Sequence, residues 1–143
     1  MTDEAFMARR FFREMLNLSV KLRINRLDYE DVFNKAQGCG SLNAGFKVQT
    51  SPQGDAMQVA VAEMAELDDE YQRLFQDYML HRQKARGLIS SINDTRLQNV
   101  LRLRYCAEMR LKDVADEMHY DYDYIKKLHV RALAECGKIM AAS

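Results

Sequence analysis

Residues 118–133, MHYDYDYIKKLHVRAL, decide how the C-terminal part of the chain is expected to fold. Ile125, Leu128 and Ala132 recur at spacings of three and four, which places them on one face of a helix. Asp121 precedes this pattern, and a carboxylate at that point can accept bonds from the first backbone N–H groups of a helix. The stretch therefore predicts a helix that starts after Asp121, is capped by its carboxylate, and buries its Ile125 face.

The opposite face of this helix carries most of its charge. With Ile125 at the centre of the buried face and 100° per residue, the outward residues are Asp123, Lys126, Lys127, Val130 and Arg131. Tyr122 and Tyr124 fall on the flanks, where Tyr122 can meet a sugar or phosphate and Tyr124 can pack against the preceding helix. Three cations against one carboxylate make the outward face net basic, although the helix opens with acids and phenols.

The C-terminal region, residues 94–143, is expected to form three short helices, over about 95–107, 111–118 and 122–139. Thr95 and Gln98 are spaced as a capping box for the first of them. Ala115 is small at the point where two helices would cross closely, and Ile125 returns an aliphatic residue to the same core ten residues later. This spacing is typical of a helix-turn-helix.

The first 93 residues are expected to form a helical hairpin. A helix over 4–36 carries apolar residues spaced mostly by three or four: Phe6, Phe12, Leu16, Val20, Ile24, Leu27, Phe33 and Ala36. Residues 37–54 hold most of the glycines and the only proline, which predicts a long loop. Within this segment, Ser51 followed by Pro52 marks the start of the next helix, because Ser can cap and Pro suits the first helical position.

The second helix, residues 55–92, has the most regular pattern in the chain. Its apolar positions alternate strictly by three and four: Met57, Ala60, Met64, Leu67, Tyr71, Leu74, Tyr78, His81, Ala85, Leu88 and Ile92. This seam needs a partner helix. The favoured partner is the 4–36 helix, packed antiparallel, and the alternative is the same seam of a second chain, which would make a homo-oligomer. His81 is interpreted as a filler of the seam.

Composition excludes several classes of protein. One proline, six glycines and 48% hydrophobic residues over 143 positions favour an all-α fold. No apolar run approaches the length of a membrane span and no secretory signal is present, so we expect a cytoplasmic protein without membrane contact.

Three cysteines without a CxxC pair predict reduced thiols. The three histidines lie far apart and no catalytic or ligand set can be nominated, so no enzyme, metal or cofactor is expected. With 21 basic and 21 acidic residues, bulk charge would not attract nucleic acid.

Residues 99–136, NVLRLRYCAEMRLKDVADEMHYDYDYIKKLHVRALAEC, resemble the promoter-binding region 4 of bacterial sigma-70-type sigma factors. The matching elements are Leu103-Arg104-Tyr105, Leu111, Val114-Ala115, Met118 and Arg131-Ala132-Leu133. With the N-terminal hairpin and the Ser51–Asp55 element, the whole chain is similar to the ArpU-type phage transcriptional regulators. The family usually has Gly where His119 stands, and this resemblance implies a left-handed turn residue there.

The resemblance implies a phage or prophage transcriptional regulator that binds double-stranded DNA. The groove-facing residues would be Tyr122, Asp123, Lys126, Lys127 and Val130, and the phosphate contacts would be Arg102, Arg104, Lys112 and Arg131. Region 4 also docks on RNA polymerase. The alternative is therefore a protein-interaction module that docks on RNA polymerase or another phage protein without reading bases.

Overall fold

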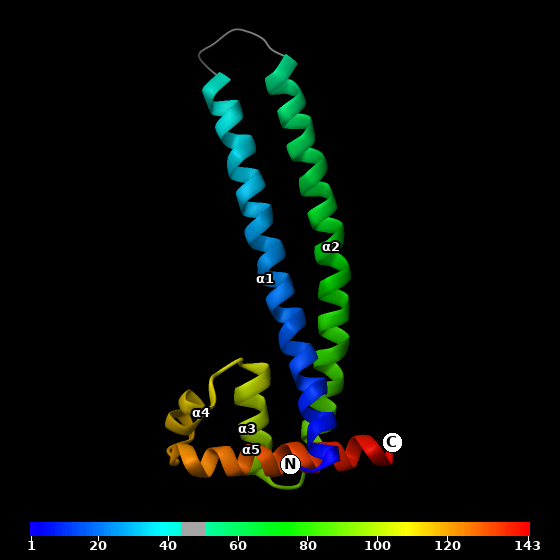
Figure 1. Cartoon of the computed structure of the whole chain (residues 1–143), viewed down its shortest axis with the longest axis vertical. Coiled ribbons are helices and arrows are strands. Elements are labelled where there is room, and N and C mark those ends of the chain that lie inside the picture. Colours follow the sequence, from blue (N-terminus) through cyan, green and yellow to red (C-terminus); the bar gives the residue numbers. More distant parts are fainter. Residues whose placement is uncertain (44–50) are drawn as a thin grey trace. The chain divides into compact units, whose positions relative to one another are not determined.

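The computed structural model describes residues 1–43 and 51–143, with side chains described for 1–38 and 54–143. Over these ranges the chain is all-α, as predicted, and contains no strand (Figure 1). The elements are α1 (Asp3–Asn43), α2 (Ser51–Ser90), α3 (Thr95–Leu101), the π-helical turn η1 (Arg102–Cys106), α4 (Leu111–Met118) and α5 (Tyr122–Ala142).

The chain separates into two compact units. The first consists of Met1–Asn17 with Tyr78–Ser143, and the second is Leu18–Asp77. The predicted boundary between residues 93 and 94 lies inside the first unit. The division falls within α1 and α2 because the N-terminal end of α1 and the C-terminal end of α2 share one core with the short helices.

In the second unit α1 and α2 pack antiparallel. Asn25, a buried polar residue, donates from Nδ2 to the carbonyl oxygen of Leu67 at 2.9 Å. Beside it, Arg26 pairs with Asp68 at 3.2 Å and lies 4.2 Å from the ring centre of Tyr71. Farther along α1, Val32 and Ala36 line a groove with Ala56 and Ala60, which come earlier in α2.

The predicted seam of α2 is confirmed. Every seam residue from Met57 to Leu88 is buried or half-buried, and apart from Arg82 the residues between them are exposed. In both units the contacts of this seam include α1: Leu67 accepts from Asn25, and His81 stacks on Phe11 with ring centres 4.2 Å apart. Because α1 occupies the seam, the structure favours the antiparallel hairpin over pairing of this seam between chains.

The predicted stripe of α1 is largely wrong. Phe6, Val20, Ile24, Leu27 and Phe33 are exposed, and of the predicted positions only Phe12 and Ala36 are buried. The buried face is made instead of Ala5, Ala8, Phe11, Phe12, Met15, Asn25, Val32 and Ala36. The helix has apolar residues on more than one side, so periodicity alone does not identify the side that α2 covers.

The boundaries of the 37–54 loop also need correction. Helix α1 continues to Asn43, and α2 already begins at Ser51, as the Ser-Pro pair predicted. The rest of the predicted loop, residues 44–50, and the side chains of Cys39 and Ser51 lie outside the described residues.

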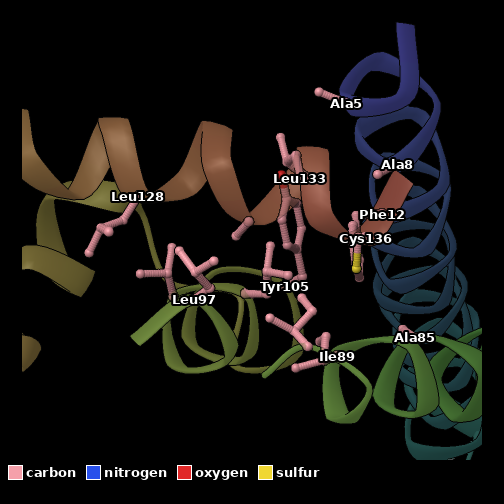
Figure 2. Close-up of a cluster of buried hydrophobic side chains, with 14 of the residues drawn as sticks. Ala5, Ala8, Phe12, Ala85, Ile89, Leu97, Tyr105, Leu128, Leu133 and Cys136 are labelled. Atoms are coloured by element: carbon pink, nitrogen blue, oxygen red, sulfur yellow. The ribbon is translucent and has the colours of Figure 1, made fainter. Parts of the chain in front are cut away.

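The core of the first unit contains buried residues from α1, α2, α3, η1, α4 and α5, with Tyr105 among them. Its ring stacks on that of Phe12 from α1, with centres 4.6 Å apart and an angle of 15° between the planes. Leu133 and Cys136 of α5 and Ile89 of α2 belong to the same buried cluster (Figure 2). The N-terminal end of α1 is therefore part of the core that supports the helix-turn-helix.

Candidate nucleic-acid interface

Helices α4 and α5 are connected by the turn that the sequence predicts. Val114 and Ala115 are buried on α4 and Ile125 is fully buried on α5. His119 ends α4 in the left-handed conformation, with φ 60° and ψ 42°, and Tyr120 N donates to the Ala115 carbonyl at 3.0 Å. The chain therefore leaves α4 and enters α5 within three residues, and Asp121, Tyr122 and Asp123 at the start of α5 are exposed.

The capping predictions are wrong in detail. Asp121 stands at the N-cap of α5 with an extended backbone, but its carboxylate makes no capping bond. At α3 the N-cap is Asp94, whose Oδ1 accepts from Arg96 N at 2.9 Å, and the capping box of Thr95 and Gln98 does not form. Gln98 instead donates from Nε2 to the carbonyl of Ile92. Asp94 stands one residue before Thr95, and because its carboxylate caps the helix, Thr95 becomes the first helical residue instead of the N-cap.

The outward face of α5 is confirmed as exposed. Asp123, Lys126, Lys127, Val130 and Arg131 are all open to solvent. Lys126 Nζ lies 3.1 Å from Asp123 Oδ1 and 4.7 Å from the centre of the Tyr122 ring. Among the described residues, Lys127 and Arg131 form no ion pair. These two therefore provide the free positive charge of this face.

The two tyrosines at the start of α5 have different surroundings. Tyr124 is half-buried: its hydroxyl accepts from Arg96 Nη1 at 2.6 Å, and its ring meets Tyr120 edge-on at 5.1 Å. Tyr122 is exposed, and Lys126 Nζ lies 4.7 Å from the centre of its ring. Of the two phenols, Tyr122 is the one that can approach a ligand, as the predicted site assumed.

The four predicted phosphate contacts come from three elements. Arg102 donates to Ser90 Oγ at the end of α2, at 3.4 Å. Arg104 donates to the Met109 carbonyl at 3.2 Å, so its guanidinium is held near the turn that precedes α4. Lys112 on α4 and Arg131 on α5 are exposed.

A part-buried hydrogen bond that the sequence does not predict supports this region. The hydroxyl of Tyr105 lies 2.7 Å from Nε2 of His129. Burial, together with the positive charges of Arg104 and Arg9, lowers the pKa of His129 to about 4. The imidazole is therefore neutral near pH 7 and pairs with the phenol as a neutral group. The position of His129, four residues after Ile125, was the signal that it borders the buried face.

The remaining reactive side chains have structural surroundings. Nε2 of His81 lies 2.8 Å from the carbonyl oxygen of Phe11, which agrees with its interpretation as a seam filler. Cys136 is buried, and burial raises the pKa of its thiol to about 12. Over residues 1–38 and 54–143, whose side chains the structure describes, no group of three or more His, Cys, Asp or Glu side chains is placed to hold a metal ion. None of the described helices is long and apolar enough to span a membrane.

The comparisons with known proteins provide no relative. Neither a family model, nor a curated protein, nor a solved structure matches the chain. The resemblance to sigma region 4 therefore stays a prediction based on the residues quoted above. The support for a nucleic-acid interface is the arrangement of the exposed side chains on α5.

Proposed function

We propose that this protein is a transcriptional regulator of the phage or prophage type that binds duplex DNA through α4 and α5. One observation carries the proposal: α5 follows a tight left-handed turn at His119 and presents an exposed face of groove-compatible side chains over its first three turns. A helix presented in this way fits the major groove of B-form DNA, which is wide enough to admit it.

The side chains of this face suit a mixed set of DNA contacts. Lys127 and Arg131 are free cations that can meet phosphates or guanine, and Val130 can contact a thymine methyl group. Asp123 can accept from a cytosine amino group, although it also neutralises Lys126 at 3.1 Å. We therefore expect contacts with the bases to provide much of the preference for one DNA sequence. In this proposal the protein binds DNA in the cytoplasm and catalyses no reaction.

The test is a selection of bound duplexes from a random library by the full-length protein, followed by fluorescence anisotropy with the enriched sequence. Lys127→Ala and Arg131→Ala should each weaken binding several-fold, since each removes a free cation from the face. Lys138→Ala is the matched control, because Lys138 lies on the same helix and pairs with Glu135 at 3.6 Å. Equal effects of all three substitutions would contradict a groove-facing role for this face.

A second candidate function rests on the apolar character of the same face. Tyr122 is 43% exposed and Val130 is 40% exposed, and the charge of Lys126 is offset by Asp123. These features also suit a contact with a protein such as RNA polymerase. Salt distinguishes the two functions, because DNA binding weakens steeply as salt rises whereas an apolar protein contact does not.

A further inference from the structure

Arg9 and Arg13 of α1 lie next to the helix-turn-helix because Phe12, which stands between them in the sequence, packs against Tyr105. Phe12 stacks on Tyr105 at 4.6 Å, and Arg9 and Arg13 lie three residues before and one residue after it on α1. Both arginines are exposed. Arg9 and Arg13 are four residues apart, so they lie on the same side of α1, next to the ring of Phe12 that is held against Tyr105.

Arg104 adds a third cation to this place. Its guanidinium carbon lies 5.2 Å from the centre of the Tyr105 ring, and it donates to the Met109 carbonyl. Burial lowers the pKa of His129 most, and the positive charges of Arg104 and Arg9 lower it further; burial raises the pKa of Tyr105, and the charges of Arg104, Arg9 and Arg13 oppose that rise. Arg104 therefore lies at the ring of Tyr105, and Arg9 and Arg13 come from the part of α1 whose Phe12 stacks on that same ring.

No carboxylate neutralises these cations within the part of the chain that the structure describes. The ion pairs found there do not include Arg9, Arg13 or Arg104. Like charges held together by the core repel one another, and a phosphate relieves that repulsion while it accepts guanidinium N–H bonds.

This group of cations borders the proposed groove-facing surface. His129 lies three residues after Lys126 on α5, so the two are neighbours along the same side of that helix. His129 bonds to Tyr105, which contacts Arg104 and Phe12, so the Lys126 edge of α5 is connected through this cluster to η1 and α1. A duplex that contacts the first turns of α5 would present its sugar-phosphate backbone at that edge.

We propose that Arg9 and Arg13 of α1, with Arg104 of η1, form a second surface that binds the phosphate backbone of the same duplex. The inference rests on the proposed DNA binding and extends it to the N-terminal helix, which lies outside the region that resembles sigma region 4. These contacts add affinity that is independent of base sequence and depends on salt.

The experiment measures the affinity of the full-length protein for a random duplex and for the selected duplex across a series of salt concentrations. The variant with both Arg9→Gln and Arg13→Gln should flatten the slope of log affinity against log salt by about two ions. At about 0.15 M salt it should lose roughly ten- to a hundredfold in affinity for both duplexes alike. Arg10→Gln is the matched control, because Arg10 is a neighbour on α1 that pairs with Glu14 at 3.7 Å.

A variant with both Arg9→Lys and Arg13→Lys keeps the charges and should retain most of the slope, which separates a phosphate contact from a folding defect. An unchanged slope for the double glutamine variant, while Lys127→Ala weakens binding, overturns the inference and leaves the proposed function standing. Absence of duplex binding by the unmodified protein overturns both. A loss from the arginine variants without any effect of Lys127→Ala or Arg131→Ala supports the α1 surface and contradicts the reading role of α5.

Discussion

Gly137 of α5 lies directly against the backbone of Glu4 at the start of α1. A Cβ at this position would overlap the carbonyl group of Glu4. The two helices therefore cross more closely than any residue with a side chain permits. This crossing belongs to the same core as the stack of Phe12 on Tyr105, so it also holds Arg9 and Arg13 beside the helix-turn-helix.

Gly137→Ala should therefore destabilise the first unit. The added methyl group must push α1 and α5 apart, and overpacking of this kind costs about 1–3 kcal/mol. Gly87→Ala is the control, because a Cβ there meets nothing within 4 Å and Gly87 lies inside α2. It should leave stability unchanged or raise it by up to about 1 kcal/mol. Urea unfolding followed by circular dichroism measures both, and equal effects would contradict the close crossing.

Ala115→Glu should unfold the helix-turn-helix. Ala115 is 2% exposed between α4 and its neighbours, so a glutamate would be overpacked and buried without a partner. Ala107→Glu introduces the same side chain at an exposed position just after η1 and should leave the fold intact. Comparison of amide NMR spectra of the two variants decides the point. A folded Ala115→Glu variant would show that α4 does not pack as described.

Acid should destabilise the first unit through His129. The folded pKa of about 4 lies below the ordinary value of 6.5, so the unfolded chain takes up a proton first as the pH falls. The effect is absent above about pH 7, grows as the pH falls from about 6.5 to about 4, and reaches about 2–3 kcal/mol there. Urea unfolding at several pH values measures this loss.

His129→Gln tests the assignment of that acid sensitivity. The amide can still bond to the Tyr105 hydroxyl but cannot be protonated, so the dependence between pH 4 and 6.5 should shrink. His119→Asn is the control, because His119 is exposed in the α4–α5 turn and Asn tolerates its left-handed backbone. If the control removes the dependence as well, His129 is not its source.

Two aspartates at helix starts should differ in their effect on stability. Asp94→Ala should cost about 1 kcal/mol, because its carboxylate accepts from Arg96 N at the start of α3. Asp121→Ala should change stability by less than about 0.5 kcal/mol, since its carboxylate makes no capping bond in α5. Thermal unfolding of both variants measures the difference. A larger loss for Asp121→Ala than for Asp94→Ala would show that Asp121 caps α5 after all.

Asn25→Leu should retain the stability of the second unit and loosen the pairing of its helices. The Leu67 carbonyl that accepts from Asn25 is inside α2, and Arg26, which also donates to Asn25 Oδ1, keeps its ion pair with Asp68, so the substitution leaves no isolated buried group. A buried Asn in a seam specifies register and partner at some cost in stability. We expect an equal or higher melting temperature together with association between chains, measured by light scattering. Asn34→Leu, at an exposed position of α1, should cause neither change beyond its own surface effect.

The two long helices differ in how well the sequence predicts which of their sides is buried. The buried side of α2 could be predicted because its apolar residues form one unbroken alternation with polar residues elsewhere. The buried side of α1 could not, because apolar residues such as Ile24 and Leu27 occupy a second side and the covered side includes Asn25. Which side is covered depends on the partner helix, and the partner's register is not a local property.

By itself the sequence determined the all-α class, the break before α3, the α4–α5 turn at His119 and the outward face of α5. These features follow from local chemistry, namely helix periodicity and turn residues within a few positions of one another. Only the tertiary structure decided that Tyr105 bonds to His129, that Gly137 meets Glu4, and that Phe12 of α1 stacks on Tyr105. Each of these pairs residues far apart in the chain, and their approach is determined by how the helices pack around a shared core.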